Sequence, residues 1–125
     1  MAISSGPNKN ALGLVLVIDA ANPKSYTGLG TTLSNAAATS VIHKANIKNG
    51  PTYIGQWFGS LNFDDNDDFL VISNDATFQT NTGTLYAWVK TGITDPQLKS
   101  IITKNNAYGI YLRNGLPIVI DWSTR

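Results

Sequence analysis

The sequence predicts an all-β fold, an antiparallel β-sandwich, and three observations lead to this prediction. Charged residues make up only 14% of the 125 residues, whereas Thr, Asn, Ser and Gly, which are typical of strands and turns, are abundant. Short β-branched and aromatic runs alternate with Gly, Asn, Asp and Pro. Two of these runs are separated only by Asn114-Gly115, a strong hairpin signal. At this length we expect one core, in a sandwich domain at residues 12–125.

The first third of the chain predicts an arm, a strand and a loop. Residues 1–11 are polar and contain glycine and proline, which indicates an N-terminal arm. The β-branched run Leu14–Ile18 predicts a first core strand that is buried on both faces. Turn residues predict a loop from Ala20 to Thr32. Residues 33–48 leave two alternatives open, a helical turn capped by Asn35 or an extended segment.

Strand signals are denser beyond Pro51, where each apolar run is flanked by turn residues. We expect seven strands in this part of the chain, at Thr52–Phe58, Ser60–Phe63, Phe69–Ser73, Thr84–Lys90, Ser100–Lys104, Tyr108–Arg113 and Leu116–Trp122. With the first strand, they suffice for two stacked sheets.

The last two predicted strands form a hairpin. Asn114-Gly115 suits a type I′ turn, in which both central residues have positive φ, and a two-residue loop pairs Arg113 with Leu116. Pro117 has no N–H to donate to a ladder. Its strand should therefore face an edge or a bulge at that point.

The aspartate-rich stretch Asp64–Asp68 is the main candidate site, and three interpretations compete for it. An EF-hand calcium loop is excluded because Phe69 occupies the position that requires glycine, and because a strand follows instead of a helix. A calcium site of another type stays open, since carboxylate oxygens on a loop suit this ion. Aspartate and asparagine also favour turns on their own. We therefore predict a hairpin turn, assign no metal ligand and no cofactor, and keep calcium as the alternative.

The composition argues against an enzyme. The chain has no glutamate, no cysteine and one histidine, which removes most catalytic constellations. Neighbouring exposed aspartates offer no apolar pocket to raise a pKa, as glycoside hydrolysis requires. Only a pairing of Asp19 or Asp121 across the fold stays open. His43, next to Lys44, is expected to be an exposed loop residue, not a ligand or a pH switch. We assign no catalytic residue.

Aromatic side chains leave two interpretations open. Tyr53, Trp57, Trp88 and Trp122 present flat apolar faces on which a sugar could stack. In a small sandwich most such rings fill the core instead. We expect Trp88 in the core, as part of the strand Thr84–Lys90, and leave Trp57 undecided.

Charge and hydropathy exclude two classes of partner. The nine Lys and Arg residues are scattered among eight Asp residues, so no basic face is available for nucleic acid. The longest apolar stretch, Leu12–Ile18, is too short to span a bilayer, and the N-terminus lacks the apolar region of a secretion signal. The sequence predicts a soluble chain that binds neither nucleic acid nor membrane.

Five sequence blocks that together cover most of the chain occur in a distinctive order. They are GLVLVIDAANPKSYTGLGTT at 13–32, NGPTY at 49–53, GSLNFDDNDDFLVI at 59–72, LYAWVK at 85–90 and IITKNNAYGIYLRNG at 101–115. In this order they resemble the concanavalin-A-like, laminin-G-like jelly-roll domains of tailed-phage virion proteins. The resemblance implies two stacked antiparallel sheets, with Asp64–Asp68 as a turn between neighbouring strands. The polar arm followed by Asp-Ala-Ala-Asn is similar to the start of structural proteins of marine and cyanobacterial phages.

Two departures from the family pattern matter. Relatives usually have an aspartate-led, glycine-rich segment where this chain has LSNAAATSVIHKANIK at 33–48, which puts a loop-borne site there in doubt. Relatives also continue for several more strands, whereas this sequence stops at Asp121–Arg125 while it still has a strand pattern. The expected jelly roll is then incomplete at its C-terminus. Either a longer protein has been cut, or another chain completes the sheet.

These observations favour a non-enzymatic structural protein of the phage virion, a head decoration or an appendage subunit. It would act through contacts with other virion proteins in a symmetric assembly. The alternative is a glycan-binding, lectin-like adhesion module, with or without calcium. An endoglycanase ranks third because the chain has no glutamate.

Overall fold

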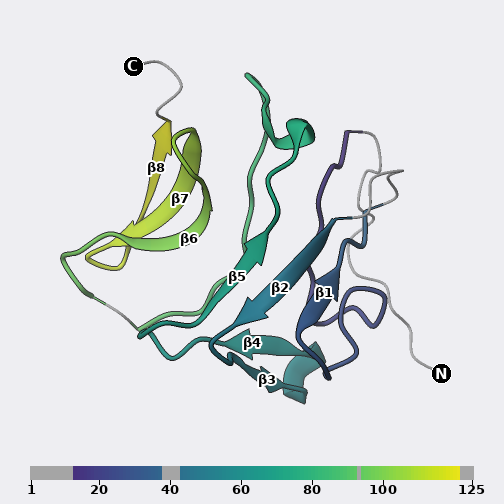
Figure 1. Cartoon of the computed structure of the whole chain (residues 1–125). Helices are drawn as coiled ribbons and strands as arrows, with labels where there is room; N and C mark the ends of the chain where they lie inside the picture. Colours follow the sequence, from purple (N-terminus) through teal and green to yellow (C-terminus); the bar gives the residue numbers. More distant parts are fainter. Residues whose placement is uncertain (1–12, 38–42, 93, 122–125) are drawn as a thin grey trace. The chain divides into compact units, whose positions relative to one another are not determined.

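The computed structural model describes residues 13–37, 43–92 and 94–121, without the side chain of Trp57. The chain divides into two compact units, residues 1–74 and 75–125, and we describe each by itself. Within the described residues every strand pairing is antiparallel, and the helical content is limited to two short 3-10 turns. This confirms the all-β prediction (Figure 1). The predicted arm at residues 1–11 lies outside the described residues.

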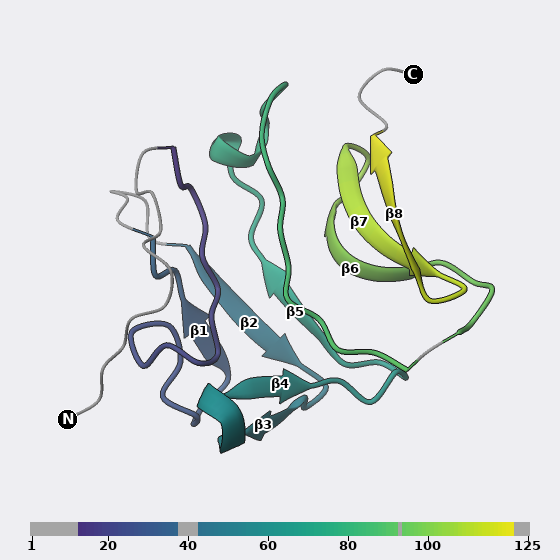
Figure 2. The same cartoon turned by 180° about the vertical axis from the view of Figure 1, so that it is seen from behind.

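Unit 1 contains two sheets. Strands β1 (Thr32–Ser34), β2 (Lys44–Lys48) and β5 (Phe69–Ile72) form one sheet, with β2 in the centre. Strands β3 (Thr52–Ile54) and β4 (Ser60–Asn62) form a separate pair, and the 3-10 turn η1 (Gln56–Phe58) connects them. Figures 1 and 2 both show this pair beside one end of β2.

The core of unit 1 lies on one face of the β1–β2–β5 sheet. Leu33 on β1 is opposite Ala45 on β2, which is opposite Ile72 on β5. Directly paired residues of antiparallel strands point to the same face, and Leu33 and Ala45 are fully buried there. The ring of Tyr26 completes the cluster. The half-buried side chains packed against it are Ile18, Ala20, Ile47, Tyr53, Leu61, Leu70 and Ile72.

The prediction of a first core strand at Leu14–Ile18 is wrong. The segment forms no strand of a sheet, and it is not buried on both faces. Val17 is buried, but Val15, two residues earlier, is exposed, and Leu14, Leu16 and Ile18 are half-buried. The Asn35 side chain takes the place of a neighbouring strand. Its Oδ1 accepts hydrogen bonds from the Val17 and Ala37 N–H groups, and its Nδ2 donates to the Val15 carbonyl. An amide side chain offers the same donor and acceptor as a peptide group, so the segment is held without a regular ladder.

The other predictions for unit 1 have mixed outcomes. The loop from Ala20 to Thr32 is confirmed up to the start of β1. The open region 33–48 contains the strands β1 and β2, and the described residues Ala36 and Ala37 are not helical. Residues 38–42 lie outside the described residues. The predicted strand Thr52–Phe58 ends early, because the chain turns into η1 after β3.

Unit 2 contains the 3-10 turn η2 (Ala76–Phe78) and a three-stranded meander of β6 (Lys99–Lys104), β7 (Tyr108–Arg113) and β8 (Leu116–Asp121). The predicted hairpin is confirmed: Asn114 and Gly115 both have positive φ, and Arg113 pairs with Leu116. β8 has no second neighbour among the described residues, so Pro117 lies on an edge strand as predicted.

The predicted strand Thr84–Lys90 is wrong. No strand is present there, and each of these residues is exposed. Trp88, which we expected in the core, is 94% exposed. The alternation of the sequence suits a strand, but a strand needs a neighbouring strand to bond with, and no strand of the described residues is paired with this segment.

Candidate functional site

The candidate site lies in the connection from β4 to β5 and consists of Asp64–Asp68. This connection leaves the β3–β4 pair and enters the β1–β2–β5 sheet, so it joins strands of two different sheets. The prediction of a turn is confirmed, but the turn is not a hairpin between paired neighbours. We call Asp64–Asp68 the acidic turn.

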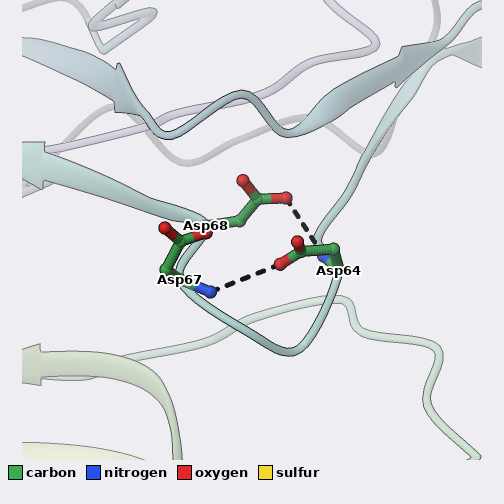
Figure 3. Close-up of side chains that lie close together, drawn as sticks. All are labelled: Asp64, Asp67 and Asp68. Atoms are coloured by element: carbon green, nitrogen blue, oxygen red, sulfur yellow. Dashed lines mark hydrogen bonds between the residues drawn. The ribbon is translucent and has the colours of Figure 1, made fainter.

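Side-chain to backbone hydrogen bonds shape the acidic turn. The Asp64 carboxylate accepts from the Asn66 N–H at 2.9 Å and from the Asp67 N–H at 3.4 Å. The Asp68 carboxylate accepts from the Asp64 N–H at 3.0 Å, which closes the loop at its base (Figure 3). Asp65 has a φ of 64°, a conformation that aspartate tolerates better than most residues. The residue types therefore explain the turn by local bonding alone.

These hydrogen bonds favour the ionised form of Asp64. The N–H of Asn66 is the largest cause that holds the pKa of Asp64 below its usual range, and the N–H groups of Asp67 and Asp68 act in the same direction. Desolvation, the second-largest cause, acts in the opposite direction and raises the pKa. The Asp64 side chain is fully exposed, so water screens the influence of these N–H groups on its pKa.

Asn49 attaches the acidic turn to the end of β2. Its side-chain Nδ2 donates to the Asp67 carbonyl oxygen at 2.6 Å. The backbone of Asn49 itself has a φ of 64°. Sequence reasoning missed this contact, because no local pattern links two residues that are separated by the whole β3–β4 pair.

The three carboxylates of Asp64, Asp67 and Asp68 could each offer one oxygen to a cation, and these oxygens lie within 4.8 Å of one another. Asp64 and Asp67 are exposed and Asp68 is half-buried. Oxygen ligands on a flexible loop suit Ca²⁺. Two of the three carboxylates already accept backbone hydrogen bonds that fold the turn, so the arrangement is also that of a turn without an ion.

The other predicted candidates are dispersed. His43 is 6% exposed, which contradicts the expected exposed loop position, because it lies directly before β2 and its carbonyl accepts from the Asn35 N–H. Tyr53 packs edge-on against Tyr26 with ring centroids 5.4 Å apart. Asp19 belongs to unit 1 and Asp121 to unit 2. The side chains of Trp57 and Trp122 lie outside the described residues.

Unit 2 contains a groove that sequence reasoning did not find. It has a volume of about 440 Å³ and lies between the residues after η2 and the β6–β7 turn. The Tyr108 hydroxyl donates to the Phe78 carbonyl at 2.8 Å and ties these two segments together. The lining is Phe78, Gln79, Thr80, Asn81, Lys104, Asn105, Asn106, Ala107 and Tyr108. It combines amides, two hydroxyls, one cation and two aromatic residues, but no carboxylate.

Unit 2 also exposes large apolar side chains. Trp88 is the most exposed, and Val119 and Leu116 on β8 are 75% and 67% exposed. In the sheet, Ile102, Ile110 and Val119 share one face, and Tyr111 and Ile118 share the other. Both faces of this sheet therefore carry apolar side chains among polar ones.

No family model, no curated protein and no solved structure matches this chain. Among the described residues, no helix is long and apolar enough to cross a membrane.

Proposed function

We propose that this chain is a non-enzymatic structural protein of a phage virion, a head decoration or an appendage subunit that acts through protein–protein contacts. We also propose that its three antiparallel sheets belong to a concanavalin-A-like jelly roll. The order of the five sequence blocks supports both proposals.

The exposed apolar surface of unit 2 is the observation that carries the proposal. Soluble monomers rarely expose large contiguous apolar patches, and such patches occur where proteins meet. Trp is enriched at the energetic centres of interfaces, and Trp88 is almost fully exposed. A three-stranded sheet with apolar side chains on both faces gains stability when a further layer covers it.

Two measurements test this proposal. Mass spectrometry of purified phage particles should find the chain in a fixed stoichiometric amount. Light scattering after size-exclusion chromatography should show an assembly whose mass falls for Trp88→Ser while the free energy of unfolding stays the same. Phe58→Ser is a matched control, because Phe58 is an exposed aromatic residue of unit 1. Absence of the chain from particles, or a concentration-independent monomer, contradicts the proposal.

A glycan-binding adhesion module is the second candidate, and the groove of unit 2 favours it. Sugars are bound by amide and hydroxyl groups together with the flat face of an aromatic ring, and the groove offers all three. The acidic turn is the candidate calcium position in this reading. A glycan array and calorimetry with Ca²⁺ separate the candidates: binding that Tyr108→Ala abolishes supports the adhesion module. No response in either experiment removes its support.

A further inference from the structure

The sequence contains two Asn-Gly pairs, Asn49-Gly50 and Asn114-Gly115. Glycine after asparagine permits spontaneous deamidation, because no side chain shields the backbone nitrogen that must attack the asparagine amide. The two pairs have the same chemistry but different surroundings in the fold. They therefore form an internal comparison of one reaction.

The two asparagines differ in what holds their side chains. The Asn49 amide donates to the Asp67 carbonyl at 2.6 Å. Asn114 is exposed, and within the described residues its only hydrogen bond is through its backbone N–H, to the Asp95 carbonyl at 2.8 Å. The Gly115 N–H, at the second turn position of the hairpin, makes no backbone hydrogen bond in the described part of the chain.

We propose that Asn114 is a site of spontaneous deamidation in the folded protein, and that the hydrogen bond to Asp67 protects Asn49. The Gly115 nitrogen loses its proton to water and attacks Cγ of Asn114. The new N–Cγ bond forms a five-membered succinimide, and the Cγ–Nδ2 bond breaks as the amide leaves as ammonia with a proton from water. A second water molecule then opens the ring at either carbonyl carbon. The products are aspartate or isoaspartate, and one water molecule is consumed overall.

The modification changes the end of the β7–β8 hairpin. Either product places a carboxylate next to Arg113, whose Nε donates to the Pro96 carbonyl at 3.0 Å. Isoaspartate also adds the Cβ atom to the main chain, and a two-residue type I′ turn cannot absorb this added length without changing the pairing of Arg113 with Leu116. We expect the hairpin to lose stability as the chain ages. This inference does not depend on the proposed function.

Incubation of the full chain in mildly alkaline buffer, followed by tryptic digestion and mass spectrometry, tests the proposal. Cleavage after Arg113 and Arg125 gives a peptide in which Asn114 is the only asparagine. In the folded protein, Asp and isoAsp should accumulate at Asn114 several-fold faster than at Asn49. In concentrated urea, where the bond to Asp67 is lost, the two rates should converge.

An Asn114→Gly variant is the matched control, because glycine also adopts positive φ at this turn position. It should fold normally, show no mass change in this peptide, and keep its thermal midpoint on ageing while that of the wild type falls. Equal rates at both asparagines in the folded chain overturn the proposal. A difference between the two rates that persists in urea also overturns it. The same holds if Asn114 stays unmodified in the folded chain over the time in which it is converted in the unfolded chain.

Discussion

Units 1 and 2 are both built from antiparallel strands, but they are stabilised in different ways. Among the described residues, unit 1 buries the apolar side chains of Val17, Tyr26, Leu33 and Ala45. Unit 2 buries only that of Tyr111. The strands of unit 2 are longer, and β7 pairs with β8 without a break over six residues. Long strand pairing and a buried core are thus separate properties, and this chain concentrates each in a different unit.

The largest test of this difference replaces a leucine in each unit. Leu33→Ala removes a fully buried side chain from unit 1 and should lower the free energy of unfolding by about 2–5 kcal/mol. Leu116→Ala removes the same atoms from a mostly exposed position on β8 and should change it by less than about 0.5 kcal/mol. Urea denaturation measures both. Equal losses would show that β8 is covered in solution.

Two glycines of unit 1 test how tightly its core is packed. Gly28 and Gly30 both have positive φ, but a Cβ on Gly28 would lie 2.7 Å from Cε1 of Tyr53, whereas a Cβ on Gly30 would meet no atom within 4 Å. Both alanine variants lose about 1–2 kcal/mol from the backbone conformation. Gly28→Ala should lose about 1–3 kcal/mol more because of overpacking. Thermal unfolding of both variants measures the difference, and equal midpoints would mean that Tyr53 is free to move aside.

The Asn35 side chain tests whether unit 1 depends on a substitute for a strand. Asn35→Ala removes three hydrogen bonds to the segment 15–17 and to Ala37, and it should cost about 1–3 kcal/mol because partly buried groups lose their partners. Asn62→Ala, an exposed position on β4, is the control. Hydrogen exchange should show faster exchange at the Val17 amide in Asn35→Ala alone. Unchanged protection would mean that the segment is held by packing.

The smallest expected effect concerns the acidic turn. The pKa of Asp64 is lower in the folded than in the unfolded state. Ionised Asp64 therefore stabilises the fold at pH values above its unfolded-state pKa, which is about 3.9. This contribution is lost as the pH falls through the folded-state pKa. Asp64→Asn should therefore reduce the acid dependence of stability at low pH. Asp67→Asn removes a charge from the same turn and is the control. NMR titration of the wild type provides the direct measurement, and an Asp64 that titrates at or above its usual value contradicts the argument.

Sequence reasoning succeeded where structure is decided locally. The strands β6, β7 and β8 and the turn at Asn114-Gly115 were predicted because positive φ and strand propensity are properties of neighbouring residues. The acidic turn was predicted for the same reason, since its aspartates bond to their own backbone.

Sequence reasoning failed where distant residues decide the outcome. The run Leu14–Ile18 was expected to find a strand, but it lies against the side chain of Asn35. The run Thr84–Lys90 has the alternation of a strand without a ladder partner in the described residues. His43 is buried because of where β2 begins, which no local pattern indicates. The groove and the contact of Asn49 with Asp67 also depend on segments that are far apart in sequence.

Pro117 has a further consequence for how the unit 2 sheet could grow. Arg113 and Leu116 flank a two-residue turn and so exchange both backbone hydrogen bonds, which directs the backbone groups of the next residue, Pro117, away from β7. A strand that arrived there from another molecule would find no donor at this position. Fibril-like stacking through β8 is therefore interrupted near the turn, although the exposed apolar side chains of β8 favour such stacking.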